Sequence, residues 1–333
     1  MKTIKTAVIG TGYLGKFHAE KLAEMEGVEL VGVVDLDKER ANSVASANKT
    51  RGYTDYNKLI DRVDAVTIVT PTESHCSIGL DFLRRGKHVL IEKPMAITLT
   101  EADSLIKTAD ENNAVLQIGH LERFNPAVMA LKGRIQKPLF IEAQRLSPFP
   151  NRALDVDVVL DVMIHDIDII LNLVSSEIKS VDAVGIPIIT KKIDIANARL
   201  KFENGCVANV TASRVATESL RRTKIFQHDS HITIDYAAQH ISISSLTAGE
   251  AEAANAPAVT RLRQLEVEDL EIERQDSLRE EIRSFIDCSR DGKKPLVTGR
   301  DGKRALEVAG RIQEAALRSL KDFSTPDSAT SSG

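Results

Sequence analysis

A glycine-rich turn near the start of the sequence limits the folds that this chain can adopt. The apolar run 4–9 leads into Gly10-Thr-Gly-Tyr-Leu-Gly15, helical spacing follows over 16–26, and a second apolar run, 29–34, ends at Asp35. This order is typical of a dinucleotide-binding unit: a strand, a glycine turn, a helix, a second strand and an acidic residue. A glycine turn without function is the alternative, and the complete context makes it the weaker interpretation.

Each residue of this motif has an expected role. Gly10 allows the tight turn, Gly12 lets the backbone approach a pyrophosphate, and Gly15 lets the helix lie close to the sheet. The N-terminus of the helix then faces the phosphates. Asp35 should accept hydrogen bonds from the adenosine ribose hydroxyls, and its charge would repel a 2′-phosphate, so NAD is the expected cofactor. Arg40 lies too far along the next helix to replace Asp35 as the main residue that contacts the adenosine ribose.

Strands and helices continue to alternate as far as residue 121. Apolar runs at 65–69, 88–91 and 115–118 are separated by helical patterns at 74–85 and 100–112. This alternation predicts a doubly wound parallel sheet, in which ligands collect at the carboxyl ends of the strands. Several polar residues and prolines come directly after these strands: Thr70, Pro71, Glu92, Lys93, Pro94 and His120. A surface ion pair is the alternative for Glu92 and Lys93, and their position after a buried strand makes it less favoured.

The second part of the chain has a different pattern. A helical segment at 124–134 and a strand at 139–146 precede an apolar helix, and strands then follow one another between 181 and 244 without helices between them. Such a succession predicts an antiparallel sheet. Helices at 277–290 and 302–321 complete the fold. We therefore expect an α/β protein with an NAD-binding domain at 1–121, an α+β domain with a large open antiparallel sheet at 122–323, an exposed loop at 248–258 and a disordered tail at 324–333.

The apolar helix at 157–174 carries an unusual stripe of polar residues. Asp157, Asp161, His165 and Asp168 follow one another at steps of four, four and three, which places them on one helix face. Unpaired charge is costly to bury, so the stripe needs partners or a function. An internal network of salt bridges or hydrogen bonds is the alternative to an active site. The cofactor motif upstream favours the active site.

Composition excludes several classes of function. A net charge of −4 gives no basic surface for nucleic acid. No apolar run reaches the roughly 18 residues of a membrane span. The cysteines, Cys76, Cys206 and Cys288, lack the spacing of metal ligands and suit a reducing compartment. We expect a cytoplasmic protein of two domains without a metal.

Three motifs in order resemble the Gfo/Idh/MocA family of sugar and polyol dehydrogenases. They are the glycine turn 10–15, Glu92-Lys93-Pro94, and Asp161 followed four residues later by His165, and the resemblance covers nearly the whole chain. It implies that Lys93, Asp161 and His165 are catalytic, with the nicotinamide between Lys93 and the helix face that bears His165. The implied NAD contacts are Gly10, Gly12, Tyr13, Leu14, Gly15, Asp35, Thr70, Pro71, His75, Glu92, Lys93 and His120.

The residue types suit oxidation of an alcohol. A neutral imidazole can accept the hydroxyl proton near neutral pH, and a lysine beside the same oxygen can stabilise the developing alkoxide. Asp161 can bind a neighbouring hydroxyl or orient the imidazole. Which of Lys93 and His165 takes the proton first stays open, because the two groups could share it.

The segments 119–126 and 145–152 resemble the branch of the family that acts on nucleotide-sugars. This implies oxidation of the 3-hydroxyl of UDP-N-acetylglucosamine, a step towards 3-amino sugars. Arginine forks suit a diphosphate, with solvated or interface arginines as the alternative. The expected substrate contacts are Arg123, Arg145, Arg152, Asp161, His165 and Arg214. Val156, Asp157 and Met163 stand where the family often has glycine, so packing on the substrate side should differ from that of inositol dehydrogenases.

Other functions of the same fold stay open at this point. A dehydrogenase of a free sugar or inositol would leave the arginines without a role. An NAD-dependent glycosidase would hold NAD tightly and release no net NADH, and a non-catalytic sensor of NAD and sugar would need no catalytic residues. Steady-state formation of NADH separates the nucleotide-sugar and free-sugar dehydrogenases from the glycosidase and the sensor. A homo-oligomer is expected, because an open antiparallel sheet often forms a subunit interface.

Overall fold

The structure is a computed structural model that describes residues 3–149, 156–228, 230–247 and 264–324. The chain divides into two compact units. Unit 1 contains residues 1–124 and 275–307, and unit 2 contains residues 125–274 and 308–333.

Unit 1 is built on a parallel sheet of six strands in the order β3-β2-β1-β4-β5-β6. This is the order typical of a dinucleotide-binding fold, and the parallel sheet predicted from the sequence is confirmed. The strands are β1 (Ile4–Ile9), β2 (Val28–Val34), β3 (Gly52–Tyr53), β4 (Ala65–Ile68), β5 (His88–Glu92) and β6 (Leu116–Gly119). The connecting helices are α1 (Gly15–Glu24), α2 (Lys38–Ala47), α3 (His75–Leu83) and α4 (Leu99–Glu111).

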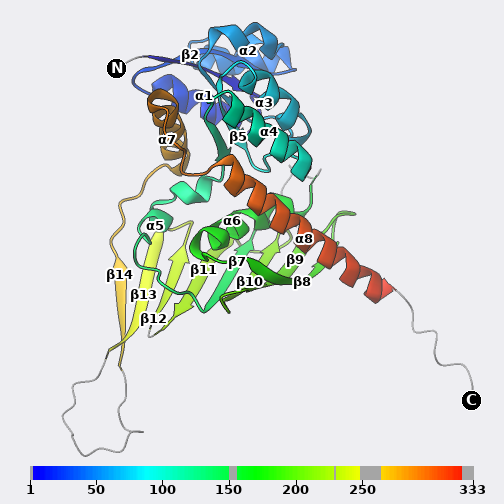
Figure 1. The fold of residues 1–333 in the computed structure, drawn as a ribbon, viewed down its shortest axis with the longest axis vertical. Coiled ribbons are helices and arrows are strands. Elements are labelled where there is room, and N and C mark those ends of the chain that lie inside the picture. The colour runs from blue at the N-terminus through cyan, green and yellow to red at the C-terminus, as the bar shows by residue number, and fades with distance from the viewer. Residues whose placement is uncertain (1–2, 150–155, 229, 248–263, 325–333) are drawn as a thin grey trace, which may run out of the picture. The chain divides into compact units, whose positions relative to one another are not determined.

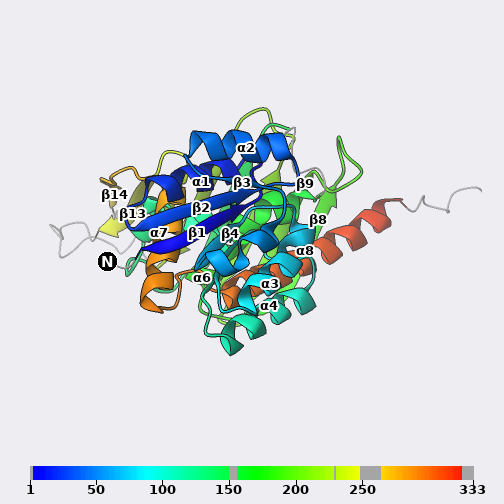
Figure 2. The same cartoon turned by 90° about the horizontal axis from the view of Figure 1, so that it is seen from above.

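Local sequence signals set the ends of these helices. The Asp37 side chain accepts hydrogen bonds from the amides of Glu39 and Arg40 and so begins α2. Thr98 and Glu101 form a reciprocal capping box at the start of α4. Strands β4 and β5 are buried along their whole length except for His88, as expected for a parallel sheet that is covered on both faces. In Figure 2, α3 and α4 lie together along one side of the sheet.

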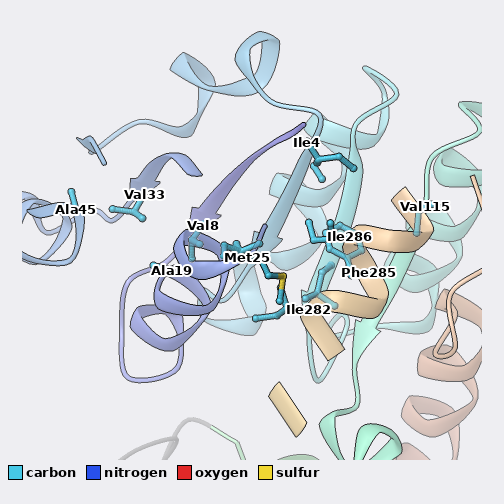
Figure 3. Packing of buried hydrophobic residues seen from close by; sticks show 13 residues of the cluster. Ile4, Val8, Ala19, Met25, Val33, Ala45, Val115, Ile282, Phe285 and Ile286 are labelled. Carbon is cyan, nitrogen blue, oxygen red and sulfur yellow. The ribbon is translucent and has the colours of Figure 1, made fainter. Parts of the chain in front are cut away.

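A helix from near the end of the sequence completes unit 1. Helix α7 (Ser277–Asp291) packs its apolar face against α1 and the sheet, with Ile282, Phe285 and Ile286 nearly fully buried (Figure 3). Each such side chain contributes about 1.5 to 3 kcal/mol on burial. Ion pairs at the edge of this contact join Lys21 to Asp276 at 3.0 Å and Glu24 to Arg279 at 3.0 Å.

Unit 2 contains a sheet of eight strands in the order β14-β13-β12-β11-β7-β10-β9-β8, and Figure 1 shows it as a broad surface with α6 on one face. Strand β9 alternates between buried and exposed residues, which is the pattern of a sheet with one covered face. The strands are β7 (Phe140–Leu146), β8 (Ile178–Ile186), β9 (Ile195–Phe202), β10 (Val207–Ser213), β11 (Leu220–Gln227), β12 (Ser230–Asp235), β13 (His240–Thr247) and β14 (Gln264–Leu270).

The helices of unit 2 are α5 (Pro126–Met129), a π-helical turn η5 (Val159–Met163), and α6 (Ile164–Leu173), which follows η5 directly. Helix α8 (Gly299–Ser324) begins in unit 1, and from Val308 onwards it belongs to unit 2. Gly185 of β8 allows this helix to lie close to the sheet, because an added Cβ would lie 3.0 Å from the Ala316 side chain.

Several expectations from the sequence differ from the structure. The predicted helix over 124–134 is limited to η4 (Leu121–Phe124) and the single turn of α5. The second sheet is mixed rather than purely antiparallel, because β7 and β10 run parallel. Strand β14 was not predicted, although its alternation of polar and apolar residues over 264–268 is the pattern of a strand.

The boundary between the units also differs from the one expected. Residues 275–307 were expected in the second domain, whereas they lie in unit 1 because the apolar face of α7 packs there. The predicted loop 248–258 lies outside the described residues. The predicted tail 324–333 also lies outside them, apart from Ser324 at the end of α8.

Among the described residues, no helix is long and apolar enough to cross a membrane. The same part of the chain contains no group of three or more His, Cys, Asp or Glu side chains that could hold a metal ion. All three cysteines are free thiols.

Candidate functional site

The glycine turn of unit 1 has the geometry that a dinucleotide requires. Gly10 has φ +93°, and an added Cβ would lie 2.5 Å from the Val69 carbonyl oxygen. At Gly15, an added Cβ would overlap the carbonyl oxygen of Gly10, so only glycine fits where α1 begins. At Gly12, by contrast, an added Cβ would meet nothing within 4 Å. The turn is therefore tight on the protein side and open at Gly12, where a pyrophosphate would approach the backbone.

Asp35 is held in place at the carboxyl end of β2. Its Oδ2 atom accepts hydrogen bonds from the amide and the hydroxyl of Thr11, both at 2.9 Å, and Oδ1 accepts one from the Asp37 amide at 3.0 Å. Burial alone would raise the pKa of Asp35, but these hydrogen bonds and the Arg40 guanidinium lower it below its ordinary value. Asp35 is therefore ionised at neutral pH and suited to accept from ribose hydroxyls.

Arg40 lies beside this carboxylate rather than in place of it. Its guanidinium is 3.5 Å from Asp35 and 3.3 Å from Asp37. Two carboxylates thus face one guanidinium, which leaves net negative charge where a 2′-phosphate would have to bind. This arrangement favours NAD over NADP.

The loops after β4 and β5 are joined by one side chain. The buried His75 imidazole places Nε2 2.8 Å from the carbonyl oxygen of Thr70 and Nδ1 2.9 Å from that of Pro94. Burial lowers the pKa of His75, which favours a neutral ring that donates from one nitrogen only. His75 was expected to contact NAD, and its described contacts are instead with the two loops that carry Thr70, Pro71 and Lys93.

Glu92 is the last residue of β5 and Lys93 follows it, and the two side chains have different surroundings. The Glu92 carboxylate is buried and its Oε1 lies 3.2 Å from Nε2 of His18 in α1. An added Cβ at Gly119 would lie 2.8 Å from the Glu92 carboxyl carbon, so the glycine makes room for this carboxylate. Lys93 is partly exposed, and the Lys93–Pro94 peptide bond is cis. Lys93 is thus presented at the strand end while its neighbours on both sides are fixed.

In unit 2, the polar stripe begins at Asp157, just before the π-helical turn η5, and continues into α6. Asp157 caps the start, because its Oδ1 accepts from the amides of Val159 at 3.0 Å and Leu160 at 3.2 Å. Asp161 and His165 are partly exposed among neighbours that are mostly buried. The sequence predicted a regular helix, and a π-helical turn of this kind is found often at functional sites.

Arg145 and Arg214, both expected to bind substrate, form buried ion pairs inside unit 2. Arg145 donates from Nε and Nη2 to the two carboxylate oxygens of Asp166, each at 2.9 Å. Arg214 donates from Nε to Asp194 at 2.9 Å and from Nη1 to the Val156 carbonyl oxygen at 2.8 Å. Their described contacts therefore favour a structural role over binding of a diphosphate.

The other expected site residues lie in unit 1, except for Arg152. Tyr13 is exposed, and its ring lies edge-on to Phe17, with ring centroids 5.8 Å apart. Leu14 is partly buried at the N-cap of α1. Arg123 is buried 3.6 Å from Asp301, and His120 is buried directly after β6. Arg152 lies outside the described residues.

Sequence reasoning missed several residues that shape the site. Thr11 holds Asp35, and its position inside the glycine motif could have indicated this role. Asp166 lies next to His165 but on another helix face, so the stripe pattern passed over it. Glu281 of α7 is fully buried in unit 1, and no local signal links it to Glu92, from which it is far apart in sequence.

Comparison with known proteins agrees with this geometry. A family model described as "Oxidoreductase family, NAD-binding Rossmann fold" matches residues 4–120, and a model of the GFO/IDH/MocA C-terminal domain matches residues 129–233. The chain is 38% identical over 313 residues to UDP-N-acetylglucosamine 3-dehydrogenase of Acidithiobacillus ferrooxidans, covering 94% of this chain and 97% of that protein. A solved structure of the same dehydrogenase superposes with a TM-score of 0.89 at 37% identity, covering 96% of this chain and all of the other.

Less similar proteins are named for other substrates. The chain is 29% identical to scyllo-inositol 2-dehydrogenase (NAD(+)) of Bacillus subtilis, with 92% of each chain covered. A structure of levoglucosan dehydrogenase in complex with NADH and levoglucosan superposes with a TM-score of 0.82 at 21% identity, covering 95% of this chain and 98% of the other. At that identity the likeness concerns the fold alone.

Proposed function

We propose, from the premise that this chain belongs to the Gfo/Idh/MocA family of NAD-binding oxidoreductases, that it oxidises the 3-hydroxyl of UDP-N-acetylglucosamine to a ketone. The observation that carries the proposal is the 38% identity, over 94% of this chain, to a dehydrogenase of that substrate. The Lys93, Asp161 and His165 motif residues expected of a dehydrogenase are all present in the sequence. A sensor without turnover would not need them.

The chemistry assigned to these residues follows from their types. NAD, when bound, supplies the acceptor for the hydride that leaves C3. His165, partly exposed on α6, accepts the proton of the 3-hydroxyl, and the Lys93 ammonium stabilises the developing negative charge on that oxygen. Asp161, four residues before His165, binds a neighbouring hydroxyl or orients the imidazole. Lys93 and His165 can share the proton.

Recognition of the UDP diphosphate is proposed for fewer residues than the sequence suggested. Arg145 and Arg214 are occupied by Asp166 and Asp194 and are not kept as diphosphate ligands. Arg123 is likewise buried beside Asp301, which leaves Arg152 as the proposed donor. The proposal also includes a cytoplasmic location and a homo-oligomer, and light scattering of the purified protein tests the oligomer.

The deciding experiment uses substrate that carries deuterium at C3. The purified protein, NAD and deuterated UDP-N-acetylglucosamine should give deuterated NADH and a 3-keto nucleotide-sugar. A coupled aminotransferase or a carbonyl trap should be included, because a ketone product less stable than the alcohol would keep turnover small. Deuterium that stays on the sugar would refute oxidation at C3.

Free inositols provide the second arm of this experiment, because the next relative oxidises an inositol. The proposal expects kcat/KM for myo- or scyllo-inositol and for free N-acetylglucosamine to be lower than for the UDP-sugar by at least about 100-fold. This is the scale expected when a substrate lacks the diphosphate that the site binds. Equal reaction of the free sugar would remove the nucleotide-sugar assignment while leaving a dehydrogenase.

A further inference from the structure

Unit 1 contains a buried cluster of titratable groups below the Glu92-Lys93-Pro94 segment. His18 comes from α1, Glu92 from β5 and Glu281 from α7. His18 and Glu281 are fully buried, and Glu92 is 8% exposed. Two carboxyl groups and one imidazole are thus enclosed between the sheet and the two helices that cover this face.

The described hydrogen bonds leave part of this cluster without partners. Neither carboxylate oxygen of Glu281 has a hydrogen-bond partner, and the same holds for Nδ1 of His18. Gln117 of β6 donates from Nε2 to the Glu281 backbone oxygen at 3.1 Å, while its own Oε1 is unpartnered. Buried polar atoms are rarely left without partners, so a fully buried carboxyl with neither oxygen partnered needs an explanation.

Charge gives that explanation. Two buried carboxylates close to each other do not both ionise at neutral pH, because the second charge is neither solvated nor compensated. Burial, and then the charge of Glu92, raise the pKa of Glu281 well above its ordinary value. Glu92 has the His18 imidazole at 3.2 Å and Glu281 has no such partner, so the proton belongs on Glu281.

We propose that Glu281 is a positioning residue for Lys93: neutral Glu281, the Glu92 carboxylate and the His18 imidazole form one buried proton-sharing network that fixes Glu92 and the lysine after it. A protonated carboxyl supplies the donor that an acceptor-only carboxylate cannot. The absence of a side chain at Gly119 leaves the space that the Glu92 carboxylate occupies. The inference rests on Lys93 acting in the proposed oxidation.

Other titratable groups on the elements that pack against α7 are already engaged. On α1, Lys21 pairs with Asp276 at 3.0 Å and Glu24 pairs with Arg279 at 3.0 Å, both at the edge of the contact. On η4, Arg123 lies 3.6 Å from Asp301, and the buried Glu122 also has a partner. Glu92 is the charge that acts on Glu281.

Three variants of the full-length protein test the proposal. E281Q keeps a neutral side chain that can donate, E281L keeps the bulk but no polar atom, and E280L changes the preceding, partly exposed residue on the same helix, which pairs with Arg283. We expect kcat of E281Q within about twofold of the unchanged protein and kcat of E281L lower by about tenfold, with KM for NAD unchanged in both. E280L should match the unchanged protein.

A double-variant cycle separates positioning from general loss of structure. If Glu281 acts through Glu92, E92Q/E281L should lose no more kcat than E92Q alone, because both changes remove the same network. If the losses of kcat in E92Q and E281L multiply in the double variant, the proposal is wrong. An E281L protein with normal kcat would also overturn it. A further overturning result is an E281Q protein as slow as E281L.

Infrared spectroscopy tests the protonation state without any substrate. The unchanged protein at pH 7 should show the carbonyl stretch of one protonated carboxylic acid, and E281Q should lack it. Its presence in both proteins, or its absence from the unchanged protein, would refute a neutral Glu281. This measurement decides the protonation of the cluster even if UDP-N-acetylglucosamine proves not to be the substrate.

Discussion

The guanidinium of Arg145 lies against the carboxylate of Asp166 through two hydrogen bonds of 2.9 Å each, with both side chains buried. The pair joins β7 to α6 at the residue that follows His165. Arg145 also lies over the Tyr236 ring, 5.1 Å from its centroid. This arginine therefore fixes the helix that carries His165.

The Arg145–Asp166 pair gives a prediction about stability. R145A should lower the free energy of unfolding by about 3 to 5 kcal/mol, because it leaves Asp166 buried without a counter-charge. R145M/D166L removes both charges and should recover most of that loss. Denaturant unfolding of the three proteins checks this. A stable R145A protein with a raised KM for the UDP-sugar would instead assign Arg145 to substrate.

The Asp35 site gives a prediction about cofactor choice. NAD should be preferred to NADP, and D35S should narrow the gap between their kcat/KM values, because it removes the carboxylate that repels a 2′-phosphate. T11V should weaken NAD binding less than D35S, since Thr11 acts through Asp35. Initial rates with both cofactors measure the effect. Equal turnover of the unchanged protein with NADP contradicts the assignment.

The proposed acid–base residues give a prediction about rate. K93A and H165A should each lower kcat by about 100-fold or more, as loss of an electrostatic or general-base group does. H165A should bind NAD nearly normally, because His165 belongs to unit 2 and the glycine turn to unit 1. Stopped-flow kinetics and NADH fluorescence titration measure the two effects. Near-normal kcat in both variants is incompatible with the proposed chemistry.

Asp194 gives a prediction about acid stability. Burial would raise its pKa, but hydrogen bonds from Thr190, Ile188 and Ile189 lower it well below the ordinary value of 3.8. The ionised form is thus favoured in the folded protein, so its stabilisation is present above about pH 3.8 and is lost as pH falls further. D194N should be less stable at pH 7, and the difference should shrink below pH 3.8. Denaturant midpoints across pH test this.

Glu281 gives the opposite pH dependence. Its pKa is raised in the folded protein, so the unfolded chain ionises first, and the folded state loses relative stability as pH rises from the ordinary value of 4.5 to the raised value. E281Q cannot ionise. As pH rises over this range, the free energy of unfolding of E281Q should therefore increase relative to that of the unchanged protein. E280L should show no such relative increase. A constant difference at all pH values would contradict a raised pKa.

Local sequence patterns predicted much of unit 1 and part of the site. The glycine turn, Asp35 and the strand ends are signalled within a few residues of one another, so the parallel sheet and NAD could be inferred directly. The buried partners of Arg145 and Arg214 could not, because pairing across 20 or 21 residues depends on how β7, β10 and α6 pack. The same holds for Glu281, whose apolar neighbours identify a buried helix face but not the core that it joins.

Helix α7 has a consequence for how the chain is made. The core of the NAD-binding unit includes Ile282, Phe285 and Ile286, which are synthesised after nearly all of unit 2. The first 124 residues emerging from a ribosome therefore expose the surface of α1 and the sheet that α7 later covers. A fragment ending at Phe124 should bind hydrophobic dyes and aggregate, and adding a peptide of residues 275–307 should restore its fold. The core of the NAD-binding unit is thus complete only after α7 has been synthesised.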